Sequence, residues 1–554
     1  MVIVARPENT TPQGSDITTP DPAEPVKPLL DASLSIASEA LVNYEIVPAK
    51  SASAEVSKLV KDLQQQLQNV FQLPINLKTE NAYNKKQYEI LIGHTNREES
   101  ETFLSHLKWD DYGYGIVGDK LVIAGKNEDG TLAALRAFLE YVNKIEGGEV
   151  FFSNADQHFV INTYPHQHFS INGIPTEELS IVCNTDGFGG VAEIIRDAII
   201  KASGIAVPII TDADVKTGDK LVVVGESAHV PQALLTIWQS ADVTGNRYSV
   251  NTTENLVWIN ASTAAGYLSA AVDLGDRIRY SSADDFVLTD AVCEGKDLMS
   301  AMSFNLMAGA QNGDKRVDRV ISIIKKYRPS VIGVQEATDN WMGILRDRLG
   351  EIYTVIGTGR NADGHDEHSA VLYLTEEFDC LESGTKWLSD TPDVPGSKLA
   401  DSHYMRIMTY ARLQSKSNGK SFLFVNTHLD YGSTATEEQV KVAQLQVLFD
   451  EIAKLPKAST IITGDFNATV DSPAYQKMKD EGFGDLSMLN DIESHANTYH
   501  ALMGTTGVPS HIDYIFTSGM IDHHFYRVCR ERVDNENVSD HYPILSVLSL
   551  EFNK

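Results

Sequence analysis

The stretch Ser459–Val470, which reads STIITGDFNATV, combines a predicted strand with residue types that can take part in catalysis. β-Branched residues lead into Gly464, which is typical of a buried strand that delivers Asp465 and Asn467 to its end. Residues two apart on a strand point the same way, so we expect this carboxylate and amide to share one opening while Phe466 faces the other side. A carboxylate can accept a proton from water or bind a metal ion, and an amide can donate to a phosphoryl oxygen.

An ordinary strand end with a polar turn would carry the same short pattern, so the case for catalysis depends on other residues. In the C-terminal half, the motifs SFN, VQE, NTHL, HIDYIF and SDHYP also place polar side chains at strand ends or beside strands. Each motif has low specificity alone. In this order along one chain, together with GDFN, the set is highly specific.

The ordered set resembles the endonuclease/exonuclease/phosphatase superfamily, the metal-dependent phosphoesterases that include nucleases, inositol phosphatases and sphingomyelinases. The resemblance covers about residues 298 to 552. It implies a four-layered α/β sandwich of the DNase I-like type, with two mixed sheets face to face and helices outside. Helical patterns at Arg316–Tyr327 and Thr436–Leu455 alternate with the strands, which agrees with this α/β fold.

The resemblance implies a metal site. A phosphodiester is anionic and resists attack by water, so a hard divalent cation is needed to neutralise the phosphoryl oxygens and the leaving oxygen. Glu336 is the best candidate ligand because it is a carboxylate at the end of an otherwise apolar strand. By resemblance, Asn305 assists it and Asp540 contributes from the SDH motif. Oxygen and amide ligands without a thiol indicate Mg²⁺ or Mn²⁺ and disfavour zinc.

The resemblance also implies the catalytic roles. Asp465 positions and deprotonates the attacking water, and Asn467 holds a phosphoryl oxygen. Asp513 and His541 form a second pair, in which the carboxylate fixes the imidazole tautomer and stabilises its charged form. His428 contacts the phosphate or protonates the leaving group, although a lone histidine at a strand end is more often structural. Which group is the general base stays open.

Two further stretches are interpreted as walls of the substrate pocket. The segment TKWLSDTP, followed by Tyr404-Met405-Arg406, resembles a sub-group of bacterial members that carry a WLS-TPD loop and a later arginine. We predict that Arg406 binds phosphate through a bidentate contact, with a surface arginine on a strand as the alternative. The sub-group often has a Trp-Asp pair before the arginine, whereas ADSH stands here. Thr498-Tyr499-His500 is expected to bring His500 close to the same pocket.

The N-terminal half contains one strand-helix-strand-strand-strand-helix pattern twice, so we predict two α/β repeats at residues 34–168 and 169–290. A disordered spacer at 1–33 precedes them, and the catalytic domain follows at 298–554. The repeats resemble the small α/β domain that precedes catalytic modules in some exported bacterial glycoside hydrolases, through Ile90–Gly93 with Thr95–Glu98. They serve either as a scaffold or as a glycan or cell-wall binding module.

Composition narrows the function. The net charge of −30 argues against unassisted binding of a polyphosphate. A sphingomyelinase should have exposed apolar loops that bind the membrane surface, and we find no aromatic-rich loop of this kind in the sequence. A small soluble substrate, such as a sugar phosphate, inositol phosphate or nucleotide, is therefore favoured for this metal-dependent phosphoesterase hydrolase, and a metal-dependent nuclease is the alternative. A glycan or cell-surface binding protein with a non-catalytic C-terminal domain is the hypothesis from another class.

Location is predicted from the first residues and from the absence of a long apolar run. The N-terminal segment lacks the features of a signal peptide, yet its Thr, Pro and Asp content is that of a spacer in exported proteins. We therefore expect an extracellular or cell-surface protein without a transmembrane segment. The four cysteines are far apart and form no CxxC pair, which gives no support for a zinc ribbon or a redox motif.

Overall fold

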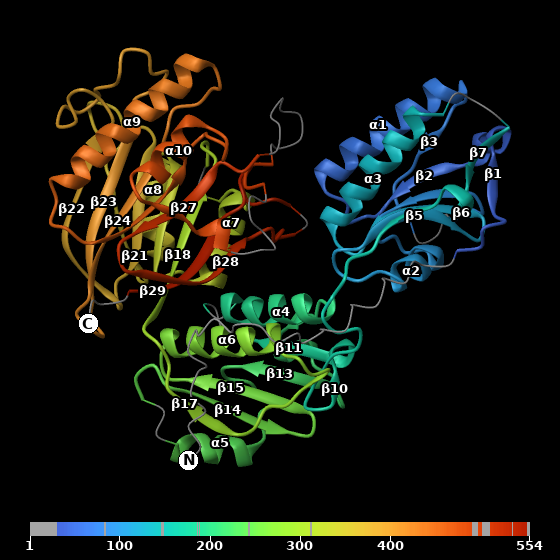
Figure 1. Cartoon of the computed structure of the whole chain (residues 1–554), viewed down its shortest axis with the longest axis horizontal. Helices are drawn as coiled ribbons and strands as arrows, with labels where there is room; N and C mark the ends of the chain where they lie inside the picture. The colour runs from blue at the N-terminus through green and yellow to red at the C-terminus, as the bar shows by residue number, and fades with distance from the viewer. Residues whose placement is uncertain are drawn as a thin grey trace, which may run out of the picture.

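The computed structural model describes residues 30–81, 85–145, 149–184, 187, 189–241, 244–310, 313–489, 497–500, 510–534 and 536–550. Figure 1 shows three bodies, which we call the first N-terminal unit (β1–β8 with α1–α3), the second N-terminal unit (β9–β17 with α4–α6) and the C-terminal domain (β18–β29 with α7–α10). Among the helices in these ranges, none combines the length and the apolar character that crossing a membrane requires.

The first sheet of the C-terminal domain has the strand order β20-β21-β19-β18-β29-β28. It is mixed, because β18 and β19 are parallel while the other neighbours are antiparallel. The strands are β18 (Leu298–Asn305), β19 (Val331–Ala337), β20 (Tyr353–Ile356), β21 (His368–Leu374), β28 (Ile521–Val528) and β29 (Ile544–Leu550).

The second sheet has the order β22-β23-β24-β25-β27-β26 and is also mixed, since only β24 and β25 run parallel. Its register puts Asp465 opposite His428 on one side and opposite Asp513 on the other. The strands are β22 (Phe378–Trp387), β23 (Ile407–Ser415), β24 (Ser421–His428), β25 (Ser459–Asp465), β26 (Gly484–Asp485) and β27 (Asp513–Ser518).

Helices cover the outer faces of both sheets. A cluster of apolar side chains that includes Phe422 and Ile461 fills the space between the sheets. Helices α7 (Lys315–Tyr327) and α8 (Asp339–Leu349) bury their apolar faces on the first sheet, and α9 (Ala435–Ala453) and α10 (Pro473–Asp480) bury theirs on the second. The predicted four-layered α/β sandwich is therefore confirmed.

A polar bridge connects the two sheets just below their catalytic edge. Asn426 Nδ2 donates to two carbonyl groups of the first sheet, both at 2.8 Å, and its Oδ1 accepts from Gln335 Nε2 at 2.7 Å and from Thr463 Oγ1 at 3.1 Å. Gly333 leaves the room for this network, because a Cβ there would lie 2.0 Å from Thr463 Oγ1. The sheets are thus held in one relative position beside the strand ends.

The two N-terminal units each contain a six-stranded sheet with the same strand order and the same strand directions. In each sheet the first four strands are parallel to one another, and the fifth strand is antiparallel to both of its neighbours. The first sheet has the order β3 (Asn76–Leu77), β2 (Glu45–Pro48), β4 (Glu89–Ile92), β6 (Lys120–Gly125), β5 (Tyr112–Val117) and β8 (His158–Val160). The second has the order β12 (Ile209–Ile210), β11 (Leu179–Cys183), β13 (Lys220–Val224), β15 (Leu256–Ala261), β14 (Tyr248–Thr253) and β17 (Ala291–Cys293).

Two long helices cover one face of each N-terminal sheet and one short helix covers the other. The short helices α2 and α5 are missing from the pattern that the sequence predicts. The helices are α1 (Ala54–Phe71), α2 (Glu98–Ser105), α3 (Glu128–Asn143), α4 (Gly189–Ser203), α5 (Gln232–Ser240) and α6 (Ala264–Arg279). Short strands complete the units: β1 (Ser35–Ala37) with β7 (Val150–Ser153), and β9 (Ser170–Ile171) with β10 (Ile174–Pro175) and β16 (Asp285–Phe286).

The second N-terminal unit packs directly on the C-terminal domain. Phe525 and Val547 belong to the same apolar cluster as the residues of α4 and α6. Around this cluster, Arg527 forms ion pairs with Asp197 at 2.6 Å and with Glu193 at 3.3 Å. The second unit and the C-terminal domain therefore share a core as well as a charged border.

Candidate active site

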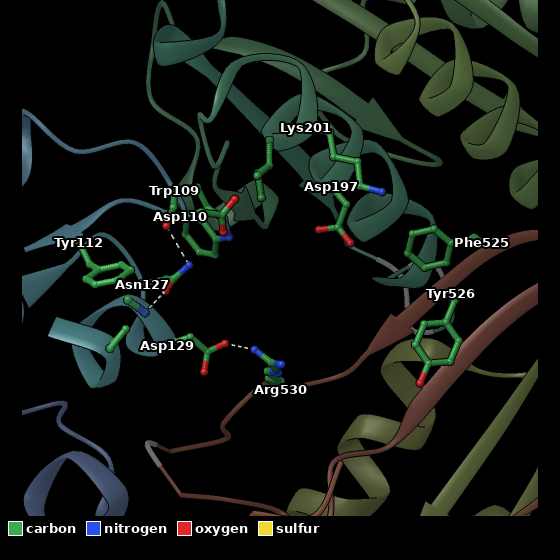
Figure 2. A pocket seen from close by; sticks show the side chains of 13 residues that line it. Trp109, Asp110, Tyr112, Asn127, Asp129, Asp197, Lys201, Phe525, Tyr526 and Arg530 are labelled. Carbon is green, nitrogen blue, oxygen red and sulfur yellow. Dashed lines mark hydrogen bonds and ion pairs between the residues drawn. The ribbon is translucent and has the colours of Figure 1, made fainter. Parts of the chain in front are cut away.

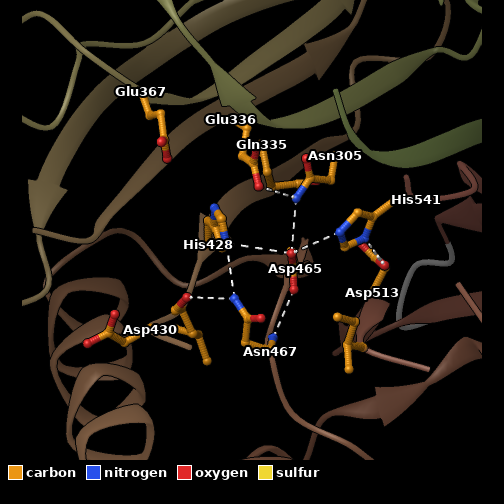
Figure 3. Close-up of polar contacts among 12 residues, drawn as sticks. Asn305, Gln335, Glu336, Glu367, His428, Asp430, Asp465, Asn467, Asp513 and His541 are labelled. Atoms are coloured by element: carbon orange, nitrogen blue, oxygen red, sulfur yellow. Dashed lines mark hydrogen bonds and ion pairs between the residues drawn. The ribbon is translucent and has the colours of Figure 1, made fainter. Parts of the chain in front are cut away.

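Polar side chains from both sheets of the C-terminal domain converge at one edge (Figure 3). Asp465 ends β25, and its neighbours His428 and Asp513 lie at the matching positions of β24 and β27. Asn305 and Glu336 come from the ends of β18 and β19 in the facing sheet. The alternation and register of the strands thus produce the convergence, since each strand presents one polar side chain as it leaves the core.

The side chain of Asn305 joins the two sheets at this edge. Its Nδ2 lies 3.1 Å from Glu336 Oε1 and 3.0 Å from Asp465 Oδ2, and its Oδ1 accepts from the backbone N–H of Met307 at 3.0 Å. One amide group therefore bridges two carboxylates that are far apart in the sequence.

His541 lies between two carboxylates. Its Nδ1 is 2.8 Å from Asp513 Oδ2 and its Nε2 is 3.7 Å from Asp465 Oδ2. Burial opposes a charge on this ring, but the carboxylates of Asp513, Asp465 and Asp540 together outweigh burial and raise the pKa of His541 to about 10. His541 is therefore an imidazolium at neutral pH, with Nδ1 donating to Asp513 and Nε2 carrying a proton on the side of Asp465.

Asp465 is buried among these groups. Burial and the nearby charge of Asp513 raise the pKa of Asp465 to about 7, while His541 and hydrogen bonds from Asn467 and Asn305 act in the opposite direction. Its Oδ1 accepts from the backbone N–H of Asn467 at 2.9 Å. Two donors, the backbone of Asn467 and the side chain of Asn305, therefore hold this carboxyl group.

His428 is neutral. Burial, together with the positive charges of Arg406 and His541, holds the pKa of His428 well below its usual range. The 3.5 Å contact between His428 Nε2 and Asp465 Oδ2 is consequently not an ion pair at neutral pH. Asn467 Nδ2 lies 3.1 Å from the same Nε2, and because an amide N–H only donates, Nε2 is the acceptor and Nδ1 carries the proton.

Two of the site residues have a strained backbone. Glu336 has φ of 55° and Asn467 has φ of 47°, both in the left-handed region that side chains other than glycine rarely adopt. Such conformations cost about 1–3 kcal/mol each and persist where the surroundings impose them. Glu336 Oε2 accepts from the backbone N–H of Ala308 at 2.8 Å, which helps to hold its conformation.

The donor set around Glu336 suits a hard divalent cation. Burial raises the pKa of Asp540, and the charge of Glu336 raises it further, partly offset by His541. Burial and Glu336 also raise the pKa of Glu367, against the effect of Arg360. These carboxylates destabilise one another, and a cation coordinated by oxygen atoms would relieve that repulsion.

A second acidic group is less suitable for a metal. Ligand atoms of Asp465, Asp513 and His541 lie within 4.8 Å of one another. However, a protonated His541 has no lone pair on either ring nitrogen and cannot coordinate an ion. The charge on His541, and not the spacing of these ligand atoms, argues against an ion here. The ligand set Glu336, Asn305 and Asp540 stays a prediction from the sequence.

Arg406 borders a small pocket of about 10 Å³ next to this edge. Its side chain is 5% exposed. Among the residues that the structure describes, its Nε has no hydrogen-bond partner, and the nearest carboxylate oxygen, on Asp430, is 3.7 Å from that nitrogen. A buried guanidinium with an unused donor is suited to an anionic ligand. Other residues that line the pocket are Glu336, Arg360, Glu367 and His428.

His500 lies apart from the other predicted substrate residues. Its backbone N–H donates to the carbonyl of Asp540 at 3.0 Å, and its ring packs on Tyr542 with centroids 4.2 Å apart. Burial lowers the pKa of His500 to about 4, and His541 adds to this effect. Within the described residues His500 does not line the pocket, so the structure gives it a place beside Asp540 and not beside Arg406.

Arg360 and Glu367 belong to the pocket but carry no sequence signal of their own. Both lie in the loop between β20 and β21, where polar residues are common. The loop is fixed from the WLS segment, since Trp387 Nε1 donates to the carbonyl of Arg360 at 2.6 Å. The only hint in the sequence is that the WLS motif lies in a predicted pocket wall.

Residues 302–541 match the model of the Endonuclease/Exonuclease/phosphatase family. An uncharacterized protein of Acanthamoeba polyphaga mimivirus is 23% identical over 253 residues, which are 42% of this chain and 91% of that protein. An endonuclease/exonuclease/phosphatase structure from Bacteroides vulgatus is 28% identical with a TM-score of 0.41, and the match covers 46% of this chain and 100% of that one.

A mannosyl-6-phosphatase structure from Bacteroides thetaiotaomicron is also 28% identical, with a TM-score of 0.39 and coverage of 46% of this chain and 100% of that one. The family model matches the region that carries all six motifs, from the strand of Asn305 to His541. The C-terminal domain of this chain therefore belongs to the endonuclease/exonuclease/phosphatase family, whose members are hydrolases that act on phosphoesters.

Proposed function

We propose that the C-terminal domain is a phosphatase that hydrolyses a small phosphomonoester with the help of a divalent cation, Mg²⁺ or Mn²⁺. The observation that carries the proposal is the contact of one amide, Asn305, with both Glu336 and Asp465. These carboxylates come from different sheets, and His428 and His541 lie 3.5 and 3.7 Å from Asp465. Such an arrangement has little structural purpose but provides the groups that phosphoryl transfer requires.

Glu336, Asn305 and Asp540 would hold the cation, which would neutralise the phosphoryl oxygens and the leaving oxygen when bound. The residues of the chain supply the remaining chemistry. Asp465 accepts a proton from a water molecule whose oxygen attacks phosphorus, and the bond from phosphorus to the substrate oxygen breaks. His541, kept protonated by Asp513, donates a proton to the leaving oxygen. Asn467 and Arg406 donate to phosphoryl oxygens and orient the group.

The pocket favours a monoester. Arg360 and Arg406 both line it; Arg360 is paired with Glu367 at 2.7 Å, whereas Arg406 keeps a donor that suits a terminal phosphate oxygen. A nucleic acid would need a basic groove, which the net charge of −30 does not support.

Aromatic side chains beside this pocket suit the organic part of the substrate. Tyr404 is 45% exposed and Tyr431 is 44% exposed, with ring centroids 5.8 Å apart. Arg360 and Arg406 lie over the Tyr404 ring at 4.9 and 5.4 Å, so this aromatic surface is continuous with the phosphate pocket. A ring compound such as a sugar phosphate could stack here while its phosphate enters the pocket.

For the N-terminal half we propose a tandem pair of α/β domains that supports the catalytic domain. The first covers 34–168, and the second begins at 169 and runs past the boundary at 290 that the sequence suggests, because β17 (Ala291–Cys293) pairs with β14 in its sheet. The identical strand order and directions of the two sheets favour this assignment. The short segment between β8, which ends at Val160, and β9, which begins at Ser170, is consistent with a boundary there.

Kinetics with two chromogenic substrates test the phosphatase proposal. We expect the purified chain to hydrolyse p-nitrophenyl phosphate faster than bis(p-nitrophenyl) phosphate, to lose activity with EDTA and to regain it with Mg²⁺ or Mn²⁺. The Asp465→Ala variant should lower kcat by about 10²–10⁴-fold. Asp471→Ala is the matched control, because Asp471 is an exposed aspartate on the same loop.

The proposal fails if Asp465→Ala is as active as the unchanged chain, or if activity survives removal of divalent cations. If the chain cleaves single-stranded DNA and hydrolyses no monoester, the proposed function changes from a phosphatase to a nuclease.

A further inference from the structure

All three bodies of the molecule contribute to a cavity of about 350 Å³ (Figure 2). Trp109, Asp110 and Tyr112 come from the first N-terminal unit, Asp197 comes from α4 of the second, and Phe525 comes from β28 of the C-terminal domain. Cavities of this size at domain boundaries are common places for small ligands. The cavity shares no lining residue with the pocket around Glu336 and Arg406.

Direct contacts between the bodies fix the walls of the cavity. Arg530 forms an ion pair with Asp129 across it, and Arg532 lies 3.2 Å from Glu128 at the start of the same helix, α3. On the opposite side, the backbone N–H of Trp109 donates to the carbonyl of Gly204 at 2.9 Å. The shape of the cavity is therefore set by the folded chain and does not require a ligand.

The walls combine aromatic faces with unused hydrogen-bonding groups. Trp109 and Tyr112 are each partly exposed. In the part of the chain that the structure describes, neither the indole N–H of Trp109 nor the hydroxyl of Tyr112 has a hydrogen-bond partner among the protein groups. Phe525 is buried and closes the cavity on the side of the C-terminal domain, as Figure 2 shows.

Asp110 adds an acceptor without a balancing cation. Its Oδ2 accepts from the hydroxyl of Tyr164 at 3.2 Å, and within the described residues it forms no ion pair. The side chain is accessible to solvent, but the surrounding protein raises its pKa, and the charges of Asp111 and Asp197 add to this effect. The other two carboxylates are paired, Asp129 with Arg530 and Asp197 with Arg527.

Three carboxylates, of Asp110, Asp129 and Asp197, line the cavity together with two cations, Lys201 and Arg530, so negative charge is in excess there and disfavours an anionic ligand. The cavity matches a compound with several hydroxyl groups and an apolar ring face, because carboxylate and indole groups can bond to hydroxyls while the aromatic rings pack on C–H groups. We propose that the cavity between the three bodies binds a neutral sugar residue of a glycan, stacked on Trp109 and hydrogen-bonded to Asp110. The site would hold the chain on a glycan independently of the phosphoesterase reaction.

Titration calorimetry of the full chain with maltose, cellobiose, lactose and chitobiose tests the proposal. At least one of these neutral disaccharides should bind, and Trp109→Ala should weaken that binding by at least about tenfold, since stacking and a hydrogen bond are both lost. Asp110→Asn, which keeps the shape of the side chain, should weaken it several-fold and serves if Trp109→Ala does not fold. Binding of the disaccharide should also raise the melting temperature.

Trp238→Ala is the matched control, because Trp238 is a partly exposed tryptophan on α5 and does not line the cavity. It should bind the disaccharide as the unchanged chain does. The proposal is overturned if no disaccharide binds below about 10 mM, if Trp109→Ala and Asp110→Asn bind normally, or if Trp238→Ala loses binding to the same extent. Binding of glucosamine or gluconate without any neutral sugar would overturn it as well.

Discussion

Two histidines at one strand edge have opposite charge states, although both are buried. His541 is flanked by Asp513 and Asp465 and is protonated, whereas His428 faces Arg406 and is neutral. Burial lowers the pKa of both rings, and at His541 the neighbouring carboxylates and the hydrogen bond to Asp513 outweigh it, whereas at His428 positive charges add to it. A single edge of the fold therefore provides a proton donor and a neutral contact within a few ångströms of Asp465.

Replacing the carboxylate behind His541 tests this division. Asp513→Asn keeps the shape of the side chain but removes the charge that stabilises the imidazolium. We expect kcat for p-nitrophenyl phosphate to fall by about 10²–10⁴-fold with little change in KM. A variant with unchanged kcat would show that His541 does not need its partner in order to act as an acid.

Replacing Arg406 tests the phosphate pocket. Arg406→Lys keeps the charge but cannot form two parallel bonds to a phosphate. We expect kcat/KM to fall by about 10–100-fold, mainly through a higher KM, because a charge-assisted bidentate contact is worth about 1.5–3 kcal/mol. Equal kinetics for lysine and arginine at this position would argue against bidentate binding.

The sequence predicts the residues that follow strands and misses those in loops. Asn305, Glu336, His428 and Asp465 are recognisable because an apolar run ends at each of them. Glu367 lies in a polar loop, where one acidic residue does not differ from its neighbours. Only the packing of that loop against the rest of the domain shows that it reaches the pocket.

At the scale of elements, α9 holds the loop that carries Asn467. The helix begins with a capping box between Thr434 and Glu437. Lys441 is completely buried on its inner face, and its Nζ donates to the carbonyl of Asn467 at 2.7 Å and to that of Gly432 at 2.8 Å. The lysine therefore helps to hold Asn467 in its left-handed backbone conformation.

Removing this contact should affect catalysis and stability together. Lys441→Met leaves two carbonyl groups without a donor, which costs about 1–3 kcal/mol, and it releases the loop of Asn467. We expect a lower melting temperature and a lower kcat. Lys457→Met, at an exposed lysine just after the same helix, is the control and should change neither. Full activity of Lys441→Met would show that the loop holds its own shape.

The predictability of elements follows their length. The patterns that predict α7 and α9 extend over several turns, and the structure contains helices in those places. The helix α2 has only Phe103 and Leu104 as large buried apolar residues, and in α5 only Leu234 is fully buried. Too few apolar positions repeat in such short helices to separate a helical period from a loop.

At the scale of the whole molecule, a network of charges joins the second N-terminal unit to the C-terminal domain. Lys326 lies 2.9 Å from Glu193 and 3.3 Å from Glu531, and Arg527 contacts both of these carboxylates at 3.3 Å. Burial works against the charge of Glu531, but Arg527 and Lys326 prevail and lower its pKa to about 2.

Because of this network, the stability of the folded chain should depend on pH in the acidic range. The folded pKa of Glu531 lies below its ordinary value of 4.5, so its contribution is complete above about pH 4.5 and is lost as the pH falls from there toward 2. We expect Glu531→Gln to melt at a lower temperature than the unchanged chain at pH 7, and the difference to shrink at pH 4 and pH 3. A difference that does not change with pH would exclude this origin.

The hydrogen bonds of Asn426 to both sheets have a consequence for the dynamics of the catalytic edge. A local separation of the two sheets would leave buried amide and carbonyl groups without hydrogen-bond partners. The backbone amide protons next to Asn426 should therefore exchange with deuterium only through global opening of the domain. Protection in β19, β24 and β25 should accordingly be the highest in the domain. The strands that carry the site residues would then stay rigid during turnover, and motion would be confined to the surrounding loops.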